Sequence, residues 1–165
     1  MHRRIDDSER TSKVAHSRAT IHGSIGGYHD RMLDFPPIAE PNLALRVLMM
    51  PRDTNHQGTI FGGIILAHVD QAGYIEARRH GLHRWVTASV DRVDFKAPVA
   101  VGEVVEFKTR TIRLGRTSVT VQVVVDAERL DGNWARVTEA QITMVSVDSQ
   151  GKAFPFREPP HSTRA

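Results

Sequence analysis

The sequence predicts an α+β fold in which one long helix is wrapped by a curved antiparallel sheet. A single segment of helical length is apolar on nearly every side, which is typical of a buried helix. Four long strand-like runs follow it, and two of their connections are short enough to be hairpin turns. The chain has 165 residues, enough for one domain with one continuous core.

Residues 1–41 show neither helical nor strand periodicity and end in the proline-rich stretch DFPPIAEPN. Their six Lys and Arg residues are balanced by six acidic residues, so this segment is not a basic arm. We expect a poorly ordered extension here, a folded domain over residues 42–157 and a C-terminal tail over residues 158–165.

The predicted domain begins with a short strand from Leu43, which Pro51 stops. A polar loop over residues 53–59 leads to the helix, which we expect to run from Gly62 to about His80. Gly81 serves as its C-terminal stop.

The four strand-like runs cover residues 85–95, 104–113, 118–130 and 133–148. The first alternates apolar and polar residues, and the third places valines 119, 121, 123 and 125 on one face. Turns at residues 114–116 and 131–133 predict an antiparallel meander. No second helix is predicted to cover the other face of the sheet, so we expect an oligomer.

Composition excludes several classes of protein. The chain has no cysteine, so a disulfide framework, a thiolate zinc site and a cysteine nucleophile are impossible. No stretch approaches the roughly 18 apolar residues of a membrane span, and we expect a cytoplasmic protein without membrane insertion. A net charge of +3 is small for a nucleic-acid-binding protein, so nucleic acid is not an expected partner; a ligand with several phosphates fits this charge as well.

Asp70 lies in the third turn of the helix that the pattern predicts to be buried. A buried carboxylate is costly unless it is paired or hydrogen-bonded, so such a residue marks a structural pair or a functional group. Gly63, Ala67 and Gly73, at three- and four-residue spacing, leave space beside it for a ligand or a partner chain. The alternative is an exposed Asp70 that is solvated or paired with an arginine.

The start of the helix is the second candidate feature. Gly62 and Gly63 let a substrate approach the backbone, and the free amides of a helix N-terminus favour a carbonyl oxygen that gains negative charge. Asp70 lies two helical turns further along the same face. This combination indicates an oxyanion hole, although a Gly-Gly pair can also serve only a turn.

The histidines are weaker candidates. His80 and His83 have the spacing of metal ligands but lie at a helix end without an acidic partner motif, so no metal site is predicted. His56 and His68 could each act as a base, but His68 lies about 200° around the helix from Asp70. The sequence has no nucleophile elbow, phosphate loop or dinucleotide motif.

The run RVLMMPRDTNHQGTIFGGIILAHVDQAG resembles the signature region of bacterial acyl-CoA thioester hydrolases related to brain acyl-CoA hydrolase. The similarity continues more loosely through VTASVDRVDFKAPVAVGEVVEFKTRTIRLGRTSVTVQVVV to TEAQITMVSVDSQGKAFPF and so covers about residues 44–156. The order Asn, Gly, Phe-Gly-Gly and then Asp, seven residues beyond the last Gly, carries the resemblance.

The resemblance implies a hot-dog fold, with two protomers forming a double hot dog and commonly a trimer of such dimers. It implies that Asp70 and Asn55 are catalytic and meet across the dimer interface, and that Gly62 and Gly63 contact the thioester carbonyl. Some relatives have His where this chain has Phe61, which argues against a His-assisted mechanism here.

The expected reaction is hydrolysis of fatty acyl-CoA to a free fatty acid and CoA, without a metal or any cofactor beyond the CoA of the substrate. Asp70 acts as general base or nucleophile, and Asn55 holds the water or the substrate. The hairpin tip with Arg113, Arg116, Thr117 and Ser118 is the candidate for contact with the CoA phosphates, and a solvated surface is the alternative.

Two other functions are alternatives to thioester hydrolysis. A hydratase or dehydratase of the same fold would rely on a His in a differently ordered motif, which this sequence lacks. A non-catalytic acyl-CoA-binding protein would keep the fold and the pocket, and the presence of both Asn55 and Asp70 argues against it.

Overall fold

The computed structural model describes residues 40–158. Its elements are β1 (Asn42–Leu48), the 3-10 helix η1 (Pro51–Asp53), α1 (Gly62–Arg78), β2 (Arg84–Asp91), β3 (Val104–Leu114), β4 (Ser118–Glu128) and β5 (Trp134–Val147). The predicted N-terminal extension and C-terminal tail lie outside the described residues, apart from Glu40, Pro41 and Glu158. No helix in the described part of the chain combines the length and the apolar character needed to cross a membrane.

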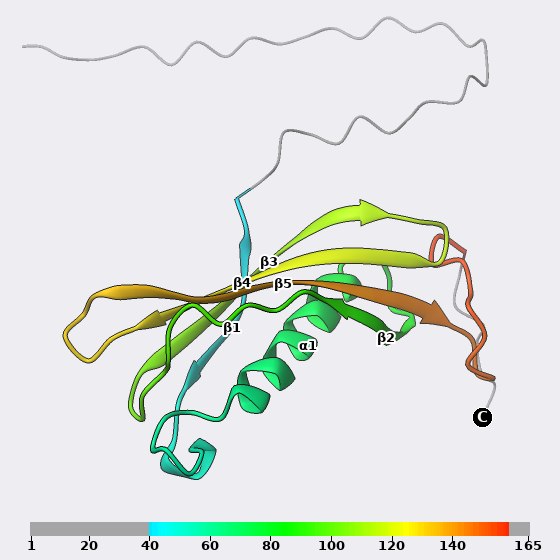
Figure 1. Cartoon of the computed structure of the whole chain (residues 1–165). Helices are drawn as coiled ribbons and strands as arrows, with labels where there is room; N and C mark the ends of the chain where they lie inside the picture. Colours follow the sequence, from blue (N-terminus) through cyan, green and yellow to red (C-terminus); the bar gives the residue numbers. More distant parts are fainter. Residues whose placement is uncertain (1–39, 159–165) are drawn as a thin grey trace, which may run out of the picture. The chain divides into compact units, whose positions relative to one another are not determined.

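The sheet has five antiparallel strands in the order β1-β3-β4-β5-β2. The strands curve around α1, which lies along the inner face of the sheet (Figure 1). The predicted α+β architecture, one long helix wrapped by a curved antiparallel sheet, is therefore confirmed.

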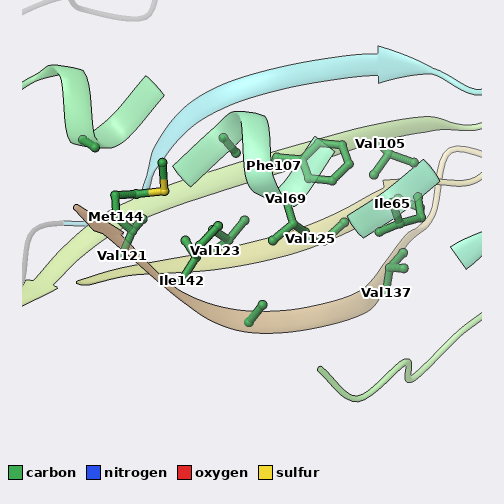
Figure 2. Packing of buried hydrophobic residues seen from close by; sticks show 14 of the residues in the cluster. Ile65, Val69, Val105, Phe107, Val121, Val123, Val125, Val137, Ile142 and Met144 are labelled. Atoms are coloured by element: carbon green, nitrogen blue, oxygen red, sulfur yellow. The ribbon is translucent and has the colours of Figure 1, made fainter. Parts of the chain in front are cut away.

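The core lies between α1 and the inner face of the sheet (Figure 2). The four alternating valines predicted to share one face of β4, Val119, Val121, Val123 and Val125, are all fully buried. Strands β3, β4 and β5 form the predicted meander, with tight connections after Leu114 and around Gly132. The alternating pattern predicted the buried face of β4 correctly. This strand is central, with a strand of the same sheet on each side of it.

Strand β2 differs from the prediction. It ends at Asp91 rather than at residue 95, and it pairs only with β5, so its other edge is unpaired within the described residues. A register shift between Thr87 and Ser89 interrupts the alternation. Val86 and Val90 are 39% and 44% exposed because the strand lies at the sheet edge.

Only one side of α1 is buried. Ile65, Val69 and Ala72 face the sheet, whereas Leu66 and Tyr74 are 39% and 37% exposed. The expectation of a helix buried all round is therefore wrong for the single chain, because five strands cover only one side of it. The backbone of α1 approaches β5 closely, since a Cβ atom on Gly73 would lie 2.6 Å from Cγ2 of Ile142.

The outer face of the sheet carries several ion pairs. Arg46 pairs with Glu128, Lys108 with Glu106 and Arg136 with Asp126, at nitrogen–oxygen distances of 2.5, 3.0 and 2.5 Å. Exposed apolar side chains also lie on the uncovered side of α1 and along β2.

Candidate active site

A groove lies between the exposed side of α1 and strand β2. Its volume is about 530 Å³, and its lining residues are Asp70, Gln71, Tyr74, Ile75, Trp85, Val86, Thr87 and Met144. Asp70 is the only lining residue with an ionisable acid or base group, apart from the phenol of Tyr74. A concave, mostly apolar site with few polar groups is typical of small-molecule binding.

Asp70 is held at this groove by a residue that the sequence reasoning missed. The Thr87 hydroxyl donates a hydrogen bond to Oδ1 of Asp70 and lies 3.4 Å from Sδ of Met144. Asp70 is exposed in the single chain, so the prediction of a buried carboxylate is wrong, and its partner is a threonine rather than an arginine. Thr87 was predicted only as a polar position of an alternating strand, and nothing in its local sequence indicates that it faces α1.

Asn55 organises the loop that precedes the helix. Its Oδ1 accepts hydrogen bonds from the backbone N–H groups of Gln57 (2.8 Å) and Thr59 (3.3 Å), and its Nδ2 donates to Oγ1 of Thr59 (2.9 Å). One N–H of the Asn55 amide remains for a ligand. Asn55 is not among the residues that line the groove of Asp70.

The Gly62 and Gly63 backbone opens α1. Their N–H groups donate to no acceptor within the described residues, as expected for the first turn of a helix. Gly62 lines a second pocket, of about 320 Å³, beside Phe95. Asp70 lies seven residues beyond Gly63, about 10 Å along the helix axis, so these amides and the Asp70 carboxylate of one chain point to separate places.

The hairpin between β3 and β4 contains the four predicted phosphate contacts. Arg113 and Arg116 are exposed and form no ion pair within residues 40–158, while Thr117 and Ser118 are partly buried. Ser118 pairs with Val145, which in turn pairs with Val86 of the groove wall. The hairpin therefore lies about 10 Å, or two strand spacings, from the groove.

Glu76 is the buried carboxylate of α1, and the sequence reasoning missed it. It is 5% exposed, and its two oxygens accept hydrogen bonds from Thr109 and Thr111, both at 3.0 Å. Nε2 of His80 lies 2.7 Å from the same Thr111 hydroxyl, and burial lowers the pKa of His80. The two threonine hydroxyls, together with Arg79, whose Nε lies 3.4 Å from Oε2, satisfy this carboxylate, so it needs no ligand to be stable inside the fold.

No histidine within residues 40–158 lines the groove. His83 is buried against the rings of Trp85 and Phe154, and His68 packs on Phe107 with Nδ1 2.8 Å from the carbonyl oxygen of Ile64. The described residues contain no group of three His, Asp or Glu side chains that could hold a metal ion.

Residues 57–131 match the model of the thioesterase superfamily. The acyl-CoA thioester hydrolase YciA of Escherichia coli is 38% identical over 119 residues, which cover 70% of this chain and 90% of that protein. An uncharacterized acyl-CoA thioester hydrolase of Zymomonas mobilis is 42% identical over 87 residues, but the match spans only 57% of its length.

Solved structures agree with these matches. A hexameric hotdog fold thioesterase of Campylobacter jejuni is 42% identical with a TM-score of 0.66, over 72% of this chain and 90% of that chain. An acyl-CoA hydrolase of Staphylococcus aureus, solved with butyryl coenzyme A and coenzyme A, is 29% identical with a TM-score of 0.62, over 70% of each chain. Alanine variants of one aspartate and of one asparagine of that enzyme have also been solved.

The helix wrapped by five antiparallel strands is therefore a hot-dog fold, and the predicted resemblance is confirmed. With its match to YciA over nine-tenths of that protein, the chain belongs to the family of YciA-like acyl-CoA thioester hydrolases within the thioesterase superfamily.

Proposed function

We propose that this protein hydrolyses the thioester bond of fatty acyl-CoA and that Asp70 is its catalytic carboxylate. The observation that carries the proposal is the position of Asp70 in a mostly apolar groove, with Oδ1 fixed by the Thr87 hydroxyl. Oδ2 has no hydrogen-bond partner among residues 40–158, so it is available to take a proton or to attack a carbonyl carbon.

The spacing of two residues supports the assignment of Asn55 and Asp70. In the Staphylococcus aureus hydrolase, the substituted asparagine and aspartate are 15 positions apart. Asn55 and Asp70 are separated by the same 15 positions, and the asparagine comes first in both chains.

A complete site requires a second copy of the chain in this proposal. Asp70 lies about 10 Å along α1 from the free amides of Gly62 and Gly63, so the amides that stabilise the oxyanion come from another protomer. The unpaired edge of β2 and the exposed side of α1 offer the contact surface. The related enzyme of Campylobacter jejuni is a hexamer, and we propose a hexamer built from three dimers here.

The proposed reaction has two forms, which differ in the role of Asp70. With Asp70 as base, its carboxylate takes a proton from a water molecule held by the Asn55 amide, and the water oxygen bonds to the thioester carbon. The amides of Gly62 and Gly63 stabilise the negative oxygen. The carbon–sulfur bond then breaks, and the proton on Asp70 passes to the CoA thiolate. With Asp70 as nucleophile, a carboxylate oxygen bonds to the thioester carbon, and the carbon–sulfur bond breaks to leave an acyl anhydride on Asp70 and a CoA thiolate. Water then cleaves the anhydride to the fatty acid and the free Asp70 carboxylate, and the proton released from the water passes to the thiolate.

The β3–β4 hairpin is proposed to bind the CoA phosphates. Arg113 and Arg116 form no ion pair in the described structure and stand beside the hydroxyls of Thr117 and Ser118. Two unpaired guanidinium groups favour a phosphorylated ligand.

The test is a thiol-release assay over a panel of acyl-CoA thioesters, with product analysis. Asp70→Asn keeps the size of the side chain and removes the base, and we expect kcat to fall by about 10²- to 10⁴-fold. The matched control is Asp91→Asn, since Asp91 is also exposed but lies at the end of β2 outside the groove. Thiol release by Asp70→Asn at the wild-type rate would disprove the assignment. A hydrated or dehydrated acyl chain among the products would indicate a different reaction on the same fold.

A further inference from the structure

We propose that Trp85 sets the length of the acyl chain by closing the end of the groove remote from Asp70. This inference rests on the proposed thioesterase function and adds a residue that determines specificity. Three features support it: the direction of the groove, the contacts that hold Trp85 in place, and the apolar lining.

The groove runs in one direction on both of its walls. On α1 the lining continues from Asp70 to Ile75, and on β2 it continues from Thr87 back to Trp85. These stretches correspond to about 7 Å along each element, the reach of about six methylene carbons. A thioester carbonyl beside Asp70 would therefore place the end of a chain of this length against Trp85.

Contacts with Gly81 and Phe156 restrict the rotation of the Trp85 side chain. It is 5% exposed, and its indole N–H donates a 3.0 Å hydrogen bond to the carbonyl oxygen of Gly81. The ring of Phe156, also 5% exposed, lies with its centroid 5.4 Å from that of Trp85. A rotation of the indole would break this hydrogen bond and would require the phenyl ring to move.

Phe156 is itself held by the end of the described chain. Ala153 forms a bridge with Val147 at the end of β5, and the backbone N–H of Phe154 donates to the carbonyl oxygen of Ser146 at 2.8 Å. The segment that carries Phe156 is thus attached to the sheet just before that residue. It provides a firm support for Trp85.

The lining favours an acyl chain over the CoA moiety. Ile75, Val86 and Met144 supply aliphatic or thioether surface, and no Lys, Arg or His of residues 40–158 lines the groove. The phosphates of CoA would find no positive charge here, whereas methylene groups gain free energy from leaving water. We therefore assign this groove to the hydrocarbon chain of the substrate.

The experiment compares kcat/KM over a series of unbranched thioesters from butyryl-CoA to palmitoyl-CoA. In Trp85→Leu, chains longer than the wild-type optimum gain apolar contact, and each newly buried methylene raises kcat/KM by about fourfold. Two further carbons should therefore gain about fifteenfold relative to wild type. The matched control is Trp134→Leu, because Trp134 is the other tryptophan of the chain and is 49% exposed on a different strand.

An equal loss of kcat/KM at every chain length in Trp85→Leu would overturn the proposal, as would the same shift in Trp134→Leu. If Trp85→Leu fails to fold, Trp85→Phe keeps a ring against Phe156 and must show a smaller shift in the same direction. If the wild type releases no thiol from any thioester, the proposed function fails. The affinity of S-alkyl-CoA thioethers for wild type and Trp85→Leu then tests the role of Trp85 separately, and unchanged length dependence would refute it.

Discussion

Thr87 donates a hydrogen bond to Asp70 across the gap between the edge strand β2 and the helix α1. The hydroxyl occupies one carboxylate oxygen and thereby orients the other. The Asp70 carboxylate is therefore positioned by the neighbouring strand, in addition to the helix backbone.

Removal of the Thr87 hydroxyl should impair catalysis more than folding. A hydrogen bond to a charged group contributes about 1.5–3 kcal/mol, so we expect Thr87→Val to lower kcat by about ten- to a hundredfold, with little change in the melting temperature. Thr87→Ser should keep most of the activity. The control Thr143→Val changes a partly buried threonine of the adjoining strand β5 outside the groove. Equal kcat values for wild type and Thr87→Val would contradict this role.

Mixing of inactive variants tests whether two copies share a site. Asn55→Asp keeps the oxygen that accepts from Gln57 and Thr59 but removes the Nδ2 donor. A dimer of one Asn55→Asp chain and one Asp70→Asn chain has one intact site if the two residues meet across the interface. Unfolding and refolding of an equal mixture should therefore restore about a quarter of the wild-type activity.

The control for the mixing experiment is refolding of each variant alone, which should give no recovery. If the mixture also stays inactive, while its chains are shown to exchange, Asn55 and Asp70 act within one chain or Asn55 serves only its own loop.

Glu76 should matter for stability. Glu76→Ala removes the acceptor that lies 3.0 Å from the hydroxyls of Thr109 and Thr111. Thr109 keeps the carbonyl oxygen of Asn42 at 3.5 Å, and we expect the free energy of unfolding to fall by about 2–4 kcal/mol. The control is Glu139→Ala. The Glu139 side chain is 36% exposed and forms ion pairs, and pairs at such exposure contribute about 1 kcal/mol or less. Urea unfolding of the three proteins measures both differences, and equal midpoints would contradict this assignment.

His80 should make the stability depend on pH. Burial lowers the pKa of His80, so the folded chain disfavours its protonated form. Between the lowered pKa and the ordinary value of about 6.5, the unfolded chain binds more protons, so stability should fall as the pH drops below about 6.5. Urea midpoints at about pH 7.5 and 5.5 should differ less in His80→Gln than in wild type, whereas His56→Gln, in an exposed loop, should behave like wild type.

The sequence predicted the parts of the fold that one chain completes by itself. The alternation from Val119 to Val125 identified the inner face of β4, because a central strand has its own sheet on both sides. Similarity of motif indicated the family and the candidates Asn55 and Asp70. Their proximity to each other stays a prediction, since it depends on a second chain.

The failures of the prediction have a common physical origin. An apolar run such as that around Leu66 and Tyr74 shows that a surface avoids water, but it does not show whether the same sheet or another chain covers it. Asp70 was expected to be buried for this reason. Glu76 was missed because its partners, Thr109 and Thr111, are more than 30 positions away in the chain.

Gly73 has no side chain, and this affects the position of the Asp70 carboxylate one turn away. A methyl group there would meet Ile142 at 2.6 Å, so almost any replacement would push α1 away from β5. Asp70 lies one turn before Gly73, and its hydrogen bond to Thr87 tolerates only a few tenths of an ångström. The absence of a side chain at Gly73 thus sets the distance between α1 and the sheet, and through it the hydrogen bond between Asp70 and Thr87.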